Sequence, residues 1–198
     1  MYPLPLSGGP TYAIIFWATY ALWLVLETFA SITKRSGDHS KARDRGSLLL
    51  IFVFFWVALT LGFSLSFLLP HAAILWNRRL VFFIGIGLML AGIAFRWYAM
   101  RVLGCFFTCD VAIQAGQTVV AVGPYRYIRH PSYSGALITQ MGLGLALGNW
   151  AALFAILASM GIGYAYRMAI EEEVLVTALG EPYKEYMRRT RRLIPYLF

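Results

Sequence analysis

The sequence predicts an all-α integral membrane protein, and three observations support this fold class. Hydrophobic residues make up 60% of the 198 residues and charged residues 13%, and the mean hydropathy is +0.66, a balance far from that of soluble domains. The apolar residues form stretches long enough to cross a bilayer. The net charge is +8, and the Lys and Arg residues that give rise to it flank these stretches. There they favour an anionic membrane face, so no nucleic-acid partner is expected.

The apolar stretches predict five transmembrane helices. The first three are expected at residues 12–32, 48–69 and 80–98. The apolar region 131–166 is too long for one span, and a turn signal with an interfacial aromatic residue interrupts it at Gly148, Asn149 and Trp150. We therefore expect a helical hairpin with arms at 131–147 and 150–166. Each arm is shorter than a full span, which tilt or packing against other helices accommodates.

The chain is expected to form a single domain over residues 1–198. Little chain lies outside the apolar stretches, so an active site has to be built from helix ends and short loops. The two segments available are 100–130, a connector, and 167–198, which should contain a C-terminal helix.

The distribution of cations predicts the orientation in the membrane. All of the 17 Lys and Arg residues except Arg78 and Arg79 would lie on one side, which the positive-inside rule assigns to the cytoplasm. The N-terminus is then outside, and the C-terminus and both active-site segments are cytoplasmic. The first apolar run is too long for a signal sequence and follows no basic region, so we expect it to be retained.

Two groups of residues resemble binding motifs but have simpler explanations. The glycines of the third helix and of the hairpin lack the strand that a dinucleotide fingerprint requires, so they are expected at helix contacts. Cys105 and Cys109 have no second pair of ligands that would complete a zinc site, so we expect reduced thiols and no metal.

Glu27 lies inside the first predicted helix, where a carboxylate is costly unless it is paired. A structural ion pair with a cation such as Arg96 is the simpler interpretation. A direct catalytic role remains the alternative.

The segment 123–135, GPYRYIRHPSYSG, places polar chemistry at a membrane boundary. Pro131 suits the first turn of a helix, and a helix N-terminus attracts an anion such as a ligand carboxylate. Tyr125 and Tyr133 offer aromatic faces to a ligand cation, although an interfacial aromatic belt is the alternative.

Arg167 and Glu171 follow the last apolar stretch and are four residues apart, so they share a helix face. An exposed pair of this kind stabilises a helix by only about 0.3–0.5 kcal/mol. Arg before Glu is the less favourable order, and three consecutive acids, Glu171 to Glu173, repel one another. A cation for an anionic substrate beside a carboxylate for a cationic cofactor explains the arrangement better.

Together these residues resemble the isoprenylcysteine carboxyl methyltransferase family and its phospholipid methyltransferase relatives. The resemblance is carried by the Arg-His-Pro-x-Tyr-x-Gly core of segment 123–135 and by a second block after the membrane exit. The second block consists of Arg167, Glu171, Glu172, Leu175, Leu179, Gly180, Tyr183, Tyr186, Arg189, Leu193, Ile194 and Pro195. The resemblance covers the last hundred residues closely and the rest in hydropathy alone.

The resemblance implies S-adenosyl-L-methionine as the methyl donor. It implies cofactor contacts from Gln117, Thr118, Val119, Val120, Tyr125, His130, Pro131, Ser132, Tyr133 and Glu171. It assigns Arg167 to the substrate, because a guanidinium can hold a carboxylate bidentately. The lipid part of the substrate would enter from the bilayer.

Three functions stay open at this point. The favoured one is methyl esterification of the carboxylate of a prenylated cysteine or a similar lipophilic acid. The second is N-methylation of a phospholipid amine, with an acid such as Glu172 removing the proton. The third is a non-enzymatic membrane binding or assembly protein.

Overall fold

The structure, a computed structural model, describes residues 3–34, 46–114 and 116–195. The basic loop expected after the first helix, residues 35–45, lies outside them. The elements are α1 (Leu4–Ser7), α2 (Pro10–Thr33), α4 (Ser47–Leu68), η2 (Pro70–Ala72), α5 (Arg78–Leu103), η3 (Gly104–Phe106), η4 (Gly123–Arg126), α6 (Pro131–Leu147), α7 (Trp150–Leu179) and α8 (Glu181–Arg189). All regular elements of these ranges are helical, as the sequence predicts.

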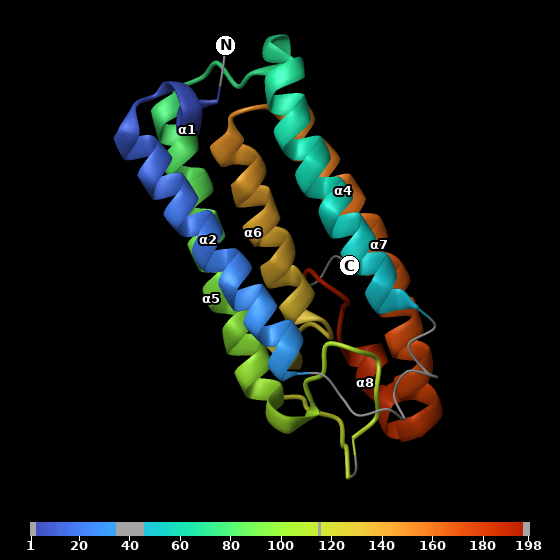
Figure 1. Cartoon of the computed structure of the whole chain (residues 1–198). Helices are drawn as coiled ribbons and strands as arrows, with labels where there is room; N and C mark the ends of the chain where they lie inside the picture. Colours follow the sequence, from blue (N-terminus) through green and yellow to red (C-terminus); the bar gives the residue numbers. More distant parts are fainter. Residues whose placement is uncertain (1–2, 35–45, 115, 196–198) are drawn as a thin grey trace.

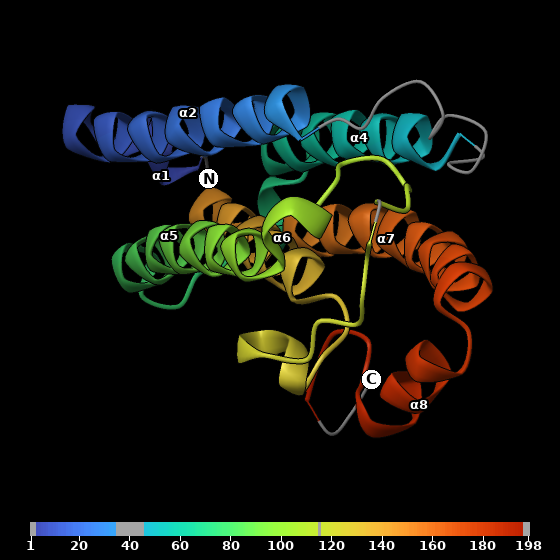
Figure 2. The same cartoon turned by 90° about the horizontal axis from the view of Figure 1, so that it is seen from below.

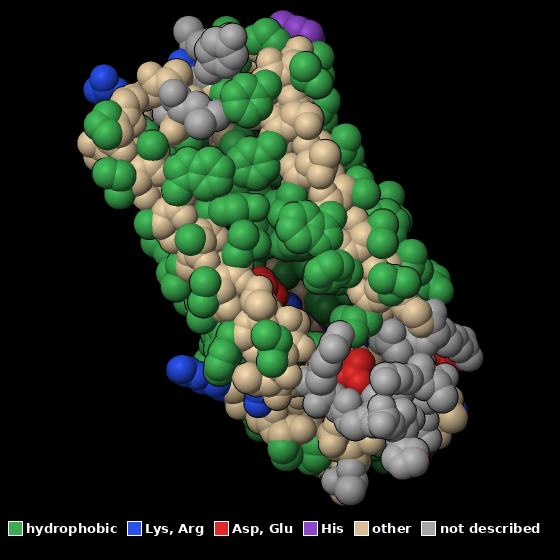
Figure 3. Space-filling model, viewed as in Figure 1, with side chains coloured by type: hydrophobic (Ala, Val, Ile, Leu, Met, Phe, Trp, Pro, Cys, Tyr) green, Lys and Arg blue, Asp and Glu red, His purple; other side chains and the backbone are tan. Residues whose placement is uncertain are grey.

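The five long helices run side by side as a tilted bundle (Figure 1). α5 packs most extensively against α6, and α4 packs against α7. Hydrophobic side chains cover the visible face of the bundle along its length (Figure 3). This surface suits a bilayer, in which apolar side chains need no water.

Within the described residues, four helices are long and apolar enough to cross a membrane: α2, α4, α5 and α7. α6 forms over the predicted bounds, but it has 17 residues and is therefore about 25 Å long, shorter than a hydrocarbon core of about 30 Å. The count of five full spans is thus not confirmed.

α7 contains the predicted membrane arm 150–166 and continues as one helix to Leu179, as the predicted shared helix face of Arg167 and Glu171 requires. Helix formers such as Ala, Glu and Leu continue through Arg167. The helix ends where Gly180 takes a φ of 64°, a left-handed conformation that favours glycine.

The interface between α5 and α6 depends on small residues, as expected. A Cβ added at Gly85 would lie 2.5 Å from the backbone nitrogen of Ala146, and one added at Gly92 would lie 2.5 Å from that of Thr139. Such distances leave no room for a side chain, so glycine allows the two backbones to approach closely.

The predicted hairpin between α6 and α7 is confirmed. Gly148 has a φ of 66°, and the Asn149 side chain caps α7 by accepting a hydrogen bond from the backbone N–H of Ala152 at 3.1 Å. Asn149 also donates to the Leu69 carbonyl at 2.9 Å. The turn is therefore fastened to the end of α4.

At the other end of the bundle, the connector, α8 and the C-terminal segment come together. Figure 2 shows η4, α8 and this segment on the side of α6 and α7 that faces away from α2. The backbone of Arg129 donates to the Arg191 carbonyl at 2.7 Å, and that of His130 donates to Arg192 at 3.0 Å. The two predicted active-site segments are thus held against each other.

Candidate active site

A single cavity of about 360 Å³ connects the connector with the interior of the helical bundle, a size typical of small-molecule sites. Its membrane side is lined by apolar residues of α2 and α4 such as Trp23, Ile51 and Phe55. A hollow with an acidic side chain inside it is visible between α2 and α4 (Figure 3). The cavity therefore joins a polar end to an apolar one.

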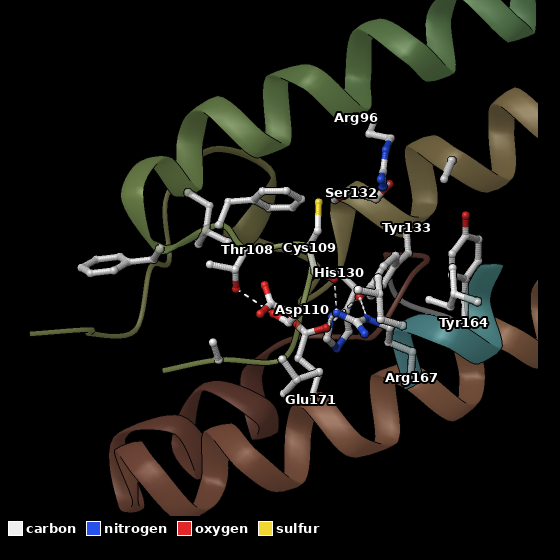
Figure 4. A pocket seen from close by; sticks show the side chains of 18 of the residues that line it. Arg96, Thr108, Cys109, Asp110, His130, Ser132, Tyr133, Tyr164, Arg167 and Glu171 are labelled. Atoms are coloured by element: carbon white, nitrogen blue, oxygen red, sulfur yellow. Dashed lines mark hydrogen bonds and ion pairs between the residues drawn. The ribbon is translucent and has the colours of Figure 1, made fainter. Parts of the chain in front are cut away.

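The structure brings nearly all predicted site residues to this cavity. Its lining includes Gln117, Thr118, Val119, Val120, Tyr125, His130, Ser132, Tyr133, Arg167 and Glu171. Pro131 is the exception: it begins α6 as predicted but is not part of the lining. Figure 4 shows Asp110, His130, Arg167 and Glu171 gathered between the connector and α7.

The Arg167 side chain is buried, with 3% of its surface exposed. It donates hydrogen bonds to the Tyr133 hydroxyl at 3.1 Å, to Ser47 Oγ at 2.8 Å and to the Cys109 carbonyl. These three partners are uncharged and come from three different segments. A planar guanidinium with several donors can hold them together in a way that a lysine cannot.

Tyr133 connects Arg167 and Glu171, the two charged residues predicted to share a helix face. Its hydroxyl donates to Glu171 Oε2 at 2.9 Å while accepting from Arg167. Its ring stacks on Tyr164, with centroids 5.0 Å apart, and on His130 at 5.6 Å. Arg167 and Glu171 do share a face of α7, as predicted, and one hydroxyl group bridges them.

Glu171 is available to a ligand cation. Its side chain is 30% exposed and lines the cavity. Oε2 accepts the hydrogen bond from Tyr133 and lies 3.9 Å from His130 Nδ1, and within the described chain no hydrogen bond or ion pair is seen for Oε1. A carboxylate in this position can bind a positively charged centre, such as a sulfonium or an ammonium group, by charge attraction.

His130 is held in place by Glu172, the neighbour of Glu171. Its Nε2 lies 3.2 Å from Glu172 Oε1. The Glu172 side chain is 5% exposed and forms ion pairs with Arg129 at 2.8 Å and Arg192 at 2.7 Å. Glu172 does not line the cavity, so this geometry does not support it as a base for a substrate amine.

Two tyrosines of α8, Tyr183 and Tyr186, line the polar end of the cavity. The Tyr186 hydroxyl donates to the Tyr125 carbonyl at 2.7 Å. Burial raises the pKa of Tyr125, Tyr183 and Tyr186 above the ordinary value of a phenol. These hydroxyls are therefore neutral near pH 7, and the Tyr186 hydroxyl acts as a hydrogen-bond donor.

Glu27 pairs with Arg96, as the simpler interpretation predicted. Arg96 Nε lies 2.7 Å from Glu27 Oε1, and its Nη2 donates to Oε2 at 3.0 Å. Arg96 Nη1 also donates to Ser132 Oγ at 2.8 Å. The pair lines the cavity and links α2 and α5 to the first turn of α6.

Sequence reasoning missed Ser47 and Cys109 as partners of Arg167, because contacts across 120 and 58 residues leave no local signal. It also missed Asp110 and Gln140, which line the cavity. Gln140 did carry a signal, since a lone amide within an apolar helix needs a partner.

Comparisons with known proteins agree with this arrangement. Residues 85–177 match the sequence model of the isoprenylcysteine carboxyl methyltransferase (ICMT) family. A protein-S-isoprenylcysteine O-methyltransferase of Schizosaccharomyces pombe is 30% identical over 109 residues, which are 48% of this chain and 46% of that protein. A protein-S-isoprenylcysteine O-methyltransferase B of Arabidopsis thaliana is 30% identical over 115 residues, 57% of this chain and 58% of that protein. The chain thus spans about half the length of these curated relatives.

The fold is similar to that of a solved structure, a eukaryotic intramembrane Ras methyltransferase of the ICMT type. The TM-score is 0.67 at 21% sequence identity, and the similarity covers 98% of this chain and 70% of the other. At this identity the comparison concerns the arrangement of helices, and it extends the similarity to helices outside residues 85–177.

Proposed function

Because the chain belongs to the isoprenylcysteine carboxyl methyltransferase family through residues 85–177, we propose that it is an S-adenosyl-L-methionine-dependent membrane methyltransferase. The proposed reaction is methyl esterification of the carboxylate of a prenylated cysteine or a similar lipophilic acid. The observation that carries this proposal is the single cavity in which Arg167 and Glu171 meet between a polar connector and an apolar wall.

The residues of the polar end suit a cofactor with a positive centre. Glu171 supplies a partly exposed carboxylate, and the Tyr133 hydroxyl holds it in place. When bound, S-adenosyl-L-methionine supplies an electrophilic methyl group. We assign the cofactor to Gln117, Thr118, Val119, Val120, Tyr125, His130, Ser132, Tyr133 and Glu171, and we leave out Pro131, which does not line the cavity.

Arg167 is assigned to the acceptor carboxylate. A bidentate guanidinium fixes the angle of a carboxylate as well as its position. An ionised carboxylate is already a nucleophile, so the protein has to align it and exclude water. Three partners hold Arg167 in one orientation, which provides that alignment.

The lipid part of the acceptor is assigned to the apolar wall formed by Trp23, Ile51 and Phe55. It enters from the bilayer through the hollow between α2 and α4 (Figure 3), and the cofactor enters from the cytoplasmic side. Residues 1–198 act as one membrane methyltransferase domain in this proposal.

The proposed orientation keeps the N-terminus outside and the C-terminus in the cytoplasm. Trp76 is 68% exposed at one end of the bundle, and Lys184 is exposed in α8 at the other. We expect Trp76→Cys to react with an impermeant maleimide from outside and Lys184→Cys to react from the cytoplasm. Asn149 is unsuitable as a probe, because its side chain is 2% exposed. The opposite pattern of labelling would contradict the orientation.

A transfer assay with a tritiated methyl group tests the function. Membranes containing the protein are supplied with methyl-labelled S-adenosyl-L-methionine and with either an N-acetylated S-farnesylcysteine or total membrane lipids. Base treatment then releases methyl esters and spares N-methyl groups. Base-labile label on the farnesylcysteine supports the proposal. Base-stable label on lipids would favour N-methylation, and no transfer at all would favour a non-enzymatic protein.

A further inference from the structure

A second pocket lies between the connector and α8, apart from the cavity that contains Arg167 and Glu171. Its volume is about 200 Å³, and its lining consists of Arg126, Tyr127, Arg188, Arg189, Arg191 and Pro195. None of these residues lines the larger cavity. Four of the six are arginines and none is acidic, so we call it the arginine pocket.

The fold brings these arginines together from two segments that are far apart in the sequence. Arg126 ends η4, and Arg188 and Arg189 form the last turn of α8. The backbone N–H of Arg191 donates to the Tyr127 carbonyl at 3.1 Å, which fastens the segment after α8 to the segment after η4. The cluster therefore persists in the folded chain although like charges repel one another.

The arginine pocket carries an excess of positive charge. Arg188 pairs with Glu181 at 3.0 Å, and Arg189 pairs with Glu185. The two remaining arginines are Arg126 and Arg191, and for them no acidic partner is seen in the part of the chain that the structure describes. All four arginines are exposed, so an anion can reach them.

The arginine pocket also borders the start of a bundle helix. Ser134, in the first turn of α6, donates through its hydroxyl to the Leu193 carbonyl at 2.7 Å, and Figure 2 shows the C-terminal segment on this side of α6. Tyr127 in the pocket lining and Ile194 beside it are each 51% exposed. Exposed apolar and aromatic side chains next to cations are typical of a membrane interface.

We propose that the arginine pocket binds the phosphate group of an anionic phospholipid. A guanidinium is a planar fork that can hold two phosphate oxygens at once. A zwitterionic phospholipid brings its own ammonium group to a pocket that already has excess positive charge, so anionic lipids are preferred. This inference goes beyond the proposed function, because the pocket shares no lining residue with the cavity assigned to methyl transfer.

Titration of the purified protein in a neutral detergent tests this inference. The probes are dioctanoyl phosphatidylglycerol, dioctanoyl phosphatidylcholine and inorganic phosphate. The test variant combines Arg126→Gln with Arg191→Gln. The matched control combines Arg101→Gln with Lys184→Gln, which removes the same charge. Both control residues are exposed and lie outside the pocket lining, so the control detects general attraction between cations and anionic lipids.

We expect the wild-type protein to bind phosphatidylglycerol about tenfold more tightly than phosphatidylcholine, as for other charge-assisted contacts. Phosphatidylglycerol should also raise the unfolding temperature, because a ligand that binds the folded state stabilises it. The test variant should lose both effects and the control should keep both. Each single variant, Arg126→Gln or Arg191→Gln, should lower the preference by about threefold if the two contacts add, so the test does not depend on the double variant alone.

Three results would overturn the inference. The first is equal affinity of the wild type for the two phospholipids. The second is an equal loss of preference in the test variant and the control, which would indicate general charge attraction. The third is binding of inorganic phosphate as tight as that of phosphatidylglycerol, which would indicate a site for free phosphate. None of these measurements uses methyl transfer, so each outcome leaves the proposed function to its own assay.

Discussion

The Tyr133 hydroxyl donates a hydrogen bond to Glu171 Oε2 at 2.9 Å. The same hydroxyl accepts a hydrogen bond from Arg167 Nε at 3.1 Å. A single group therefore orients both the residue assigned to the acceptor and the residue assigned to the cofactor. A change at Tyr133 should affect both sides of the reaction.

Tyr133→Phe removes this bridge and keeps the ring that stacks on Tyr164. Leaving Arg167 and Glu171 without their shared partner should lower kcat/KM for methyl transfer by about tenfold to a hundredfold. Steady-state kinetics on detergent-solubilised protein measure this. Tyr166→Phe serves as the control, because Tyr166 is 45% exposed. Equal activity of both variants would show that the bridge has no role.

Glu171→Gln removes the negative charge but keeps the shape of the side chain. S-adenosyl-L-methionine carries a positive sulfonium that S-adenosylhomocysteine lacks, so the variant should weaken binding of the cofactor more than binding of the product. We expect about a tenfold loss for the cofactor, as for other charge-assisted contacts. Calorimetry with both ligands provides the measurement. Glu173→Gln, on the exposed side of the helix, should bind both ligands as the wild type does. An equal loss for both ligands in Glu171→Gln would argue against charge recognition.

Glu172→Gln tests the buried network behind His130. The change leaves Arg129, whose side chain is 9% exposed, without its charged partner. Breaking a buried ion pair in this way should cost about 3 kcal/mol of stability, seen as a lower unfolding temperature in detergent. Glu185→Gln should cost less than about 1 kcal/mol, because Glu185 is 53% exposed. If the two variants unfold at the same temperature, the network does not hold the connector.

Cys109 should react slowly with alkylating agents at neutral pH. Burial raises the pKa of its thiol, and the thiolate is the reactive form. The folded state therefore holds this proton more tightly than the unfolded state. The resulting stabilisation is present below the unfolded pKa of about 8.5 and is lost as the pH rises through the higher folded value.

Single-cysteine proteins allow this to be measured. Iodoacetamide should modify the exposed Cys105 of the Cys109→Ser protein faster at pH 7 than it modifies Cys109 of the Cys105→Ser protein. The difference should narrow as the pH rises. Equal rates at pH 7 would contradict the protection that partial burial gives to Cys109.

Features set by neighbouring residues were predictable from the sequence. Pro131 marks the start of α6, and Gly148 and Asn149 mark the hairpin turn, because each acts through its own backbone conformation or cap. The shared face of Arg167 and Glu171 follows from helical spacing alone. The pairing of Glu27 with Arg96 could be predicted because an unpaired carboxylate is costly within a membrane.

Features that depend on distant segments were not predictable. Ser47 reaches Arg167 only because α4 packs against α7. Arg192 reaches Glu172 because the C-terminal segment returns along the connector. The end of α7 at Leu179 was not predicted, because hydropathy detects the end of an apolar stretch and does not detect the end of a helix.

The central claim is that Arg167 aligns an acceptor carboxylate for methyl transfer, and Arg167→Lys tests it most directly. Lysine keeps the positive charge but lacks the planar fork, and misplacing a reacting group slightly can cost about a hundredfold in rate. Arg188→Lys is the matched control, because Arg188 pairs with Glu181 on the surface.

The decisive measurement compares the rate of base-labile methyl transfer to N-acetylated S-farnesylcysteine with the affinity for S-adenosylhomocysteine in the same preparations. We predict that Arg167→Lys lowers the transfer rate by about a hundredfold and leaves the affinity almost unchanged, while Arg188→Lys changes neither. Transfer at the wild-type rate in Arg167→Lys, or a loss of affinity as complete as the loss of transfer, would contradict the assignment of Arg167 to the carboxylate.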